Sequence, residues 1–231
     1  MPRRRDLAIH LAAVLLLVTV LAPSASASVK GRSYGIYANM PSYGVALGTH
    51  CDTGWLNSTS GGSRSSYKSN VSYGNTLRCD YMESNSHGDR CKGHSGSRLE
   101  AGWILKGSPF EVTWTHMESA DEDTCCKSGD RDDISSVFEG LTFAGQPVVV
   151  TGKPNQTIYA AGATLVINER KKDGTDTDCD DDDYEHRSLH LILRNGNEVI
   201  LCASKFDSDD DCCVATSTGH STWGGVKAFY R

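Results

Sequence analysis

Carboxylates are the residues of this sequence whose number and spacing best suit a chemical role. Nineteen of the 28 aspartates and glutamates after residue 27 lie in three segments, 118–133, 173–185 and 207–211. Like charges held this close repel one another, and Ca²⁺, a hard cation with several oxygen ligands, relieves that repulsion. Nine carboxylates are therefore candidate ligands of a calcium site: Asp176, Asp178, Asp180, Asp181, Asp182, Asp183, Asp209, Asp210 and Asp211.

The spacing of these acids is not that of an EF-hand. The run from Asp176 to Asp180 alternates acids as an EF-hand loop begins, but Asp181 stands where its glycine is needed and Arg187 where its bidentate glutamate belongs. The alternative is that the acidic segments are solvated loops, which protect exposed strand edges from aggregation and bind nothing. Both hypotheses place the three segments in loops.

All nine cysteines follow residue 27, and in an oxidising compartment most should form disulfides. Because nine is odd, we expect four disulfides and one thiol that is free or joined to a second chain. Five cysteines lie in or beside the acidic segments, so disulfides would hold those loops at one end of the domain. No C-x₂-C pair is present, which favours disulfides over zinc. The candidates are Cys51, Cys79, Cys91, Cys125, Cys126, Cys179, Cys202, Cys212 and Cys213.

Motifs for hydrolysis are weak. Serine stands beside histidine in the segments 93–97 and 219–221, but neither has the spacing of a nucleophile elbow. The histidines follow no metalloprotease pattern. The separation of paired carboxylates for glycoside hydrolysis is a property of the fold. A small secreted hydrolase using loop carboxylates or histidines is therefore the alternative function, and our prediction is that the chain is not an enzyme.

The first 27 residues have the pattern of a secretory signal peptide. Arg3, Arg4 and Arg5 form a basic region, an apolar run extends to Leu21, and small residues end at Ala27. A membrane anchor is the alternative, but the apolar stretch is short for spanning. We predict cleavage after Ala27, secretion of residues 28–231 as a single extracellular domain, and no membrane span in that mature chain.

The mature chain is acidic, because removal of residues 1–27 changes the formal charge from −6 to −8. This balance argues against a nucleic acid or an anionic membrane surface as partner, since both reward clustered Lys and Arg. Three sequons mark candidate glycosylation sites at Asn57, Asn70 and Asn155.

Short alternating apolar and polar runs, bounded by Gly, Asn, Asp and Ser, predict an all-β chain. Asn195-Gly196 predicts a hairpin with a type I′ turn, and Ala144-Gly145 a second tight turn. The polar stretch 57–96 is expected to form long loops or edge strands. Strands are predicted at 33–38, 44–49, 98–105, 110–116, 137–143, 147–152, 163–170, 190–194, 198–204 and 224–230. The expected fold is a disulfide-stapled β-sandwich of about ten short antiparallel strands with long acidic loops.

One segment resembles a known family. Between residues 140 and 169 a Gly-Leu-Thr strand, a Gly-Gln-Pro turn, a Thr-Gly-x-Pro-Asn-Gln-Thr loop and a Val-Ile-Asn-Glu strand follow in order. This order resembles the choice-of-anchor P family of bacterial secreted and surface proteins, mainly over residues 137–206. The resemblance implies an extracellular β domain, and since the family's molecular function is undefined, no catalytic residue carries over.

Together these features predict a secreted structural or binding module. Its acidic loops bind calcium or a component of the cell surface, the cell wall or the matrix. Within the resembling segment, Asn155 and Gln156 are expected to serve the geometry of a turn.

Overall fold

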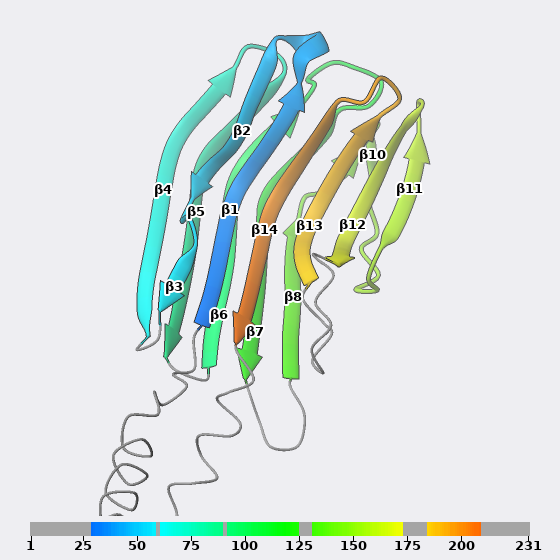
Figure 1. Ribbon diagram of the computed structural model, residues 1–231. Helices are drawn as coiled ribbons and strands as arrows, with labels where there is room; N and C mark the ends of the chain where they lie inside the picture. The colour runs from blue at the N-terminus through cyan, green and yellow to red at the C-terminus, as the bar shows by residue number, and fades with distance from the viewer. Residues whose placement is uncertain (1–28, 59–60, 90–91, 125–130, 173–183, 209–231) are drawn as a thin grey trace, which may run out of the picture.

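The computed structural model describes residues 29–58, 61–89, 92–124, 131–172 and 184–208, and these form two antiparallel sheets (Figure 1). Sheet A contains, in spatial order, β11 (Gln156–Ala160), β12 (Ala163–Lys172), β13 (Tyr184–Leu193), β14 (Glu198–Ser208), β1 (Val29–Met40) and β2 (Val45–Asp52), and β3 (Leu56–Ser58) also pairs with β1. Sheet B contains β10 (Gln146–Pro147), β9 (Thr142–Phe143), β7 (Val112–Thr124), β6 (Lys92–Ile104), β5 (Leu77–Asp89) and β4 (Gly62–Tyr73), and β8 (Arg131–Glu139) also pairs with β7. A 3-10 turn, η1 (Pro41–Tyr43), joins β1 to β2.

The all-β prediction is confirmed for the described residues, but the strands are longer than predicted. Seven of the ten predicted segments coincide with strands. The segment 137–143 spans the end of β8 and all of β9, 147–152 contains only the end of β10, and 224–230 lies outside the described residues. The prediction of loops or edge strands across 57–96 is wrong for β5 and β6, which are long strands inside sheet B. Their serines face the interior in place of apolar residues, so the usual alternation is hidden.

The acidic segments are also partly strand, which corrects their assignment to loops. β7 continues through Glu118 to Thr124, and β8 begins at Arg131. Asp121 is buried, and its Oδ2 accepts a hydrogen bond of 3.2 Å from the backbone N–H of Phe206. Backbone pairing with β6 therefore extends the sheet into sequence whose composition alone indicates a solvated loop.

The predicted turns differ in outcome. Ala144 and Gly145 have φ of 52° and 72°, and the tight turn between β9 and β10 is confirmed. Asn195-Gly196 does join β13 to β14, but of these two residues only Gly196 has a positive φ, 77°. The N–H of Gly196 bonds to the carbonyl of Leu193 at 3.1 Å, and the N–H of Leu193 to that of Asn197 at 2.9 Å. This is a three-residue loop closed by a glycine bulge, so the type I′ prediction is wrong.

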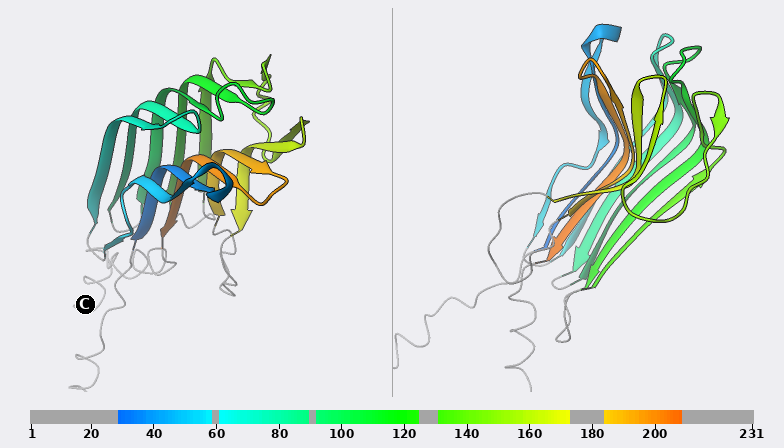
Figure 2. Two further views of the ribbon diagram at one scale, coloured as in Figure 1. Left: turned by 90° about the horizontal axis from the view of Figure 1, so that it is seen from above. Right: turned by 90° about the vertical axis from the view of Figure 1, so that its right-hand side faces the viewer.

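The interior between the sheets has an apolar end and a serine end. At the apolar end large side chains such as Met40, Leu77 and Ile104 are completely buried. At the serine end most buried side chains are small and polar, and the Phe206 ring fills the space beside Gly31 and Gly93. The small polar residues are Ser33, Ser84, Ser86, Ser95, Ser97, Ser119, Ser188 and Ser204. Small side chains let the sheets approach, and Figure 2 shows the sheets converging there and separating at the apolar end.

Candidate binding site on the outer face of sheet A

A row of kinks crosses sheet A. Each of five neighbouring strands has one unpaired residue between two stretches that pair in the same register. In order across the sheet these residues are Asn168, Ser188, Cys202, Gly35 and Cys51. Asn168, Cys202 and Cys51 have φ of 54°, 49° and 54°, a left-handed conformation that is uncommon for residues other than glycine.

The kinks reverse the normal alternation of side chains. In β13, Ser188 and Leu189 are adjacent and both 0% exposed, so both face the interior. Arg187 and His190 therefore lie three residues apart on the outer face, where an unbroken strand would space outward residues by two. Because all five strands kink at the same level, the outer face is hollowed along the row.

The hollow is a pocket of about 440 Å³ over β1, β12, β13 and β14. Tyr34, Tyr37 and Ile200 form its apolar part, and Tyr34 and Ile200 pack with Ala203 in a small apolar cluster. The polar lining consists of Glu169, Lys171, Arg187, His190 and Glu198. Every one of these residues comes from the outer face on either side of the kinks.

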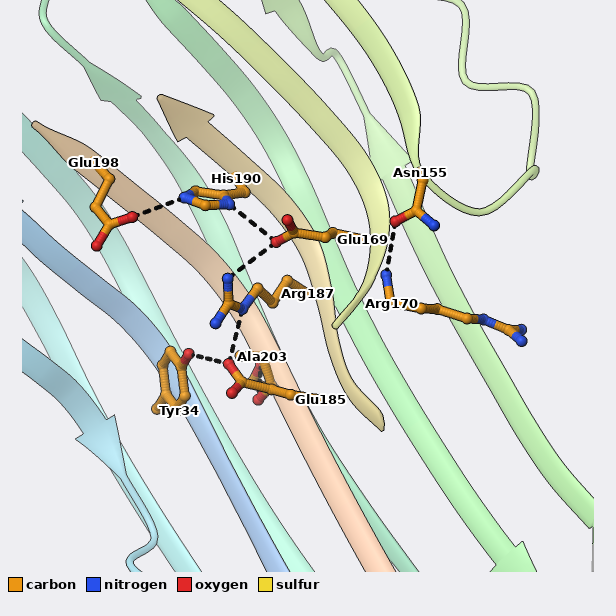
Figure 3. A network of polar contacts seen from close by, with 10 residues as sticks. Tyr34, Asn155, Glu169, Arg170, Glu185, Arg187, His190, Glu198 and Ala203 are labelled. Atoms are coloured by element: carbon orange, nitrogen blue, oxygen red, sulfur yellow. Dashed lines mark hydrogen bonds and ion pairs between the residues drawn. The ribbon is translucent and has the colours of Figure 1, made fainter. Parts of the chain in front are cut away.

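Arg187 is the centre of a polar network on this face (Figure 3). Its Nε donates to Oε1 of Glu185 at 2.9 Å, and its Nη1 donates to Oε2 of Glu169 at 3.1 Å. The Tyr34 hydroxyl donates to the same Glu185 oxygen at 2.6 Å. Arg187 is only 7% exposed although no third layer covers sheet A in the described residues, because its neighbours enclose it.

The network continues through His190, which lies between two carboxylates. Its Nδ1 is 2.9 Å from Oε2 of Glu169, and its Nε2 is 3.1 Å from Oε2 of Glu198. An ionised carboxylate can only accept hydrogen bonds, so both contacts are hydrogen bonds only when both ring nitrogens carry a proton. This geometry assigns the cationic form to His190.

Burial and charge shift the pKa values of this network in consistent directions. Burial acts to raise the pKa of Glu169, but the hydrogen bond and charge of His190 and the charge of Arg187 outweigh it, and the pKa lies below its usual value. Burial, followed by the charge of Glu185, raises the pKa of Tyr34. Burial acts to lower the pKa of Arg187, but the hydrogen bond and charge of Glu185 outweigh burial, and the pKa lies above its usual value. Glu169 and Arg187 are therefore held in their charged forms, and the Tyr34 hydroxyl is held in its neutral form.

Sheet B carries similar chemistry on its own outer face without comparable burial. His116 lies 3.3 Å from Glu100 and 3.6 Å from Glu118, and Arg98 pairs with Glu100. The Arg98 side chain is 50% exposed, compared with 8% for that of Arg187. This exposed counterpart supplies matched controls for substitutions in the hollow.

A second histidine site lies between the sheets. His186 is 1% exposed, and its Nε2 is 2.7 Å from Oγ of Ser136 in β8, which in turn lies 2.8 Å from Oγ of Ser188. Within the described residues its Nδ1 has no hydrogen-bond partner. Burial, aided by the charge of Arg170, lowers the pKa of His186 to about 4. The pair tethers β8 to sheet A with a neutral imidazole.

Because His186 titrates near pH 4 when folded and near 6.5 when unfolded, its neutral form stabilises the fold above pH 6.5. That contribution, roughly 3 kcal/mol, is lost as the pH falls from 6.5 to 4. We predict that His186→Asn removes this part of the pH dependence of the free energy of unfolding, measured by urea denaturation. His87→Asn, at an exposed histidine, is the control. Equal pH dependence in wild type and His186→Asn would contradict the prediction.

Three predicted disulfide cysteines are instead buried free thiols: Cys51, Cys79 and Cys202. The Sγ atoms of Cys51 and Cys202 donate across the interior to the carbonyls of Ser66, at 3.1 Å, and Met117, at 3.6 Å. Burial raises the pKa of each thiol, to about 12 for Cys79, so none is a reactive thiolate at neutral pH. None of these three cysteines forms a disulfide in the structure, and the disulfide-stapled part of the expected fold stays a prediction. The other candidates, Cys91, Cys125, Cys126, Cys179, Cys212 and Cys213, lie outside the described residues.

We predict that alkylation of the native mature protein leaves the three buried thiols unmodified. Unfolding in guanidinium without a reductant should expose them, so that mass spectrometry finds three further adducts. Cys202→Ser should lower that number by one. A single adduct in the unfolded, unreduced wild type would instead indicate four disulfides and contradict the assignment.

The other predicted site residues have different outcomes. All nine calcium candidates lie outside the described residues, and within those residues no three acidic, histidine or cysteine side chains are arranged to hold a metal ion. Asn57, Asn70 and Asn155 are exposed, but Oδ1 of Asn155 also accepts the N–H of Arg170 at 3.0 Å. Ser95 and Ser97 of β6 point into the interior between the two sheets, away from solvent.

Neither a family model, a curated protein nor a solved structure matches the chain. The resemblance to the choice-of-anchor P family therefore stays a prediction. Within the part of the chain that the structure describes, no helix is long and apolar enough to cross a membrane.

Proposed function

We propose that the chain is a secreted extracellular binding module, and that its ligand site is the hollow on the outer face of sheet A. The observation that carries this proposal is a pocket with an apolar part at Tyr37 and Ile200 and a partly buried polar network beside it. Small-ligand sites combine these features, with apolar surface for affinity and a few fixed polar groups for orientation.

The same geometry supports binding over hydrolysis. Glycoside hydrolysis requires one carboxyl group with a raised pKa to act as general acid, whereas the pKa of Glu169 is lowered. A general base requires a ring nitrogen able to accept a proton, and both nitrogens of His190 are held against carboxylates. These groups are arranged to orient a bound molecule.

Retention on insoluble extracellular material from the source cells tests the proposal. We predict that Glu198→Gln, which weakens the contact to His190, lowers retention at least threefold. Glu118→Gln alters the corresponding glutamate beside His116 on sheet B and should leave retention unchanged. Failure of the wild type to be retained, or equal effects of the two substitutions, would contradict a binding role for the hollow.

We further propose that calcium binds at the serine end. The strand ends that flank residues 90–91, 125–130, 173–183 and 209–231 all lie at this end, where β7 and β8 also pair (Figure 1). In that pairing Glu122 is opposite Asp133 and Asp123 is opposite Asp132. The backbone register thus brings acidic positions of two strands together at this end, and a hard cation such as Ca²⁺ favours sites with several carboxylates.

With a dissociation constant of about 10⁻⁴ to 10⁻³ M, 10 mM Ca²⁺ should stabilise the fold by about 1.4–2.7 kcal/mol. Thermal unfolding with calcium, and with magnesium at equal ionic strength, measures this gain. Asp123→Asn combined with Asp132→Asn should reduce it. An unchanged midpoint in calcium would leave the solvated-loop alternative standing.

A further inference from the structure

We infer that the ligand of the hollow is a neutral saccharide. The inference rests on the proposed binding function and names its ligand class. It follows from the net charge of the hollow, from its unused hydrogen-bonding groups and from its apolar part.

The charges around the hollow cancel. Glu169, Glu185 and Glu198 provide three negative charges, and Arg187, Lys171 and the cationic form of His190 provide three positive charges. An anion would lie against the carboxylates, and a cation, even one held over the Tyr34 and Tyr37 rings, would lie against Arg187. Neither charge gains a net attraction, so the site favours an uncharged ligand.

Donors and acceptors remain available at the rim. Within the described residues, no hydrogen bond engages Nη2 of Arg187, Nζ of Lys171, Oε1 of Glu198 or the hydroxyl of Tyr37. Two of these groups only donate, the carboxylate oxygen only accepts, and the phenol does both. Neighbouring hydroxyl groups match such a mixture, because each hydroxyl donates one hydrogen bond and accepts others. A sugar ring supplies several hydroxyls at adjacent positions.

The apolar part of the hollow suits the other side of a sugar ring. Tyr37 is partly buried against Ile200, its direct partner across β1 and β14, and against the small Ala203 cluster. The C–H groups on one face of a pyranose form an apolar surface of comparable kind. The volume of about 440 Å³ is within the range of small-ligand sites, about 300–1,000 Å³. One or a few sugar residues of a longer chain are therefore the expected occupant.

Isothermal titration calorimetry of the full mature chain tests this assignment. The neutral probes are cellohexaose, chitohexaose, xylohexaose and mannohexaose; hexagalacturonate and the chitosan hexamer are the anionic and cationic probes. At least one neutral probe should bind, and more tightly than either charged probe. Tyr37→Ala should weaken that binding at least tenfold, and Tyr37→Phe should weaken it less because the ring remains.

The control is Tyr81→Ala on sheet B, where the Tyr81 hydroxyl also donates to a glutamate, Oε2 of Glu83 at 3.1 Å. It should leave the affinity unchanged. Tighter binding of a charged probe, equal effects of Tyr37→Ala and Tyr81→Ala, or no binding of any neutral probe overturns the saccharide assignment. If Glu198→Gln still lowers retention on extracellular material at least threefold in that case, the binding function stands with another ligand. If the wild type is also not retained on extracellular material, both the saccharide assignment and the proposed binding function fail.

Discussion

The left-handed backbone at Asn168, Cys202 and Cys51 is the constraint on which the hollow depends. Such conformations cost on the order of 1–3 kcal/mol each and persist only where the surroundings hold them. Here the interior holds two of them, because the Cys51 and Cys202 thiols donate to backbone carbonyls of sheet B. The kinks of one sheet are thus fixed by the other, and a feature of the outer surface is determined in the core.

The polar networks on the outer faces of sheets A and B have similar composition but differ in how far they are buried. Arg, His and Glu side chains meet on both outer faces, yet on sheet B Arg98 and Glu118 are about half exposed, and exposed ion pairs contribute little to stability. On sheet A the hollow lets side chains surround Arg187, and the weaker screening strengthens the same contacts. Sheet B has a comparable row of unpaired residues at Asn70, Asp80, Ala101 and Thr115, so the kinks alone do not make an orienting site. The enclosure of Arg187 by its neighbours is also required.

The sequence predicted the β class, the Ala144-Gly145 turn and the hairpin between β13 and β14, because these depend on local alternation and glycine. It did not predict the hollow, whose residues are brought together by pairing of β1 with β14. The signal was a spacing of three between outward residues, as in Tyr34 and Tyr37 or Arg187 and His190. That spacing can be recognised only once it is known which face of the sheet each residue points to. The long strands of 57–96 were missed because serines occupy their inward positions.

A row of serines separates the weakly apolar end of the interior from the end that holds the buried thiols. Ser66, Ser84, Ser97, Ser119 and Ser136 are paired in register across five strands of sheet B, so one end of the interior has few large apolar side chains. The three buried thiols belong to the apolar cluster, where a cysteine acts as a small hydrophobic residue. A weakly apolar end gains most from crosslinks and bound ions, since burial contributes least there.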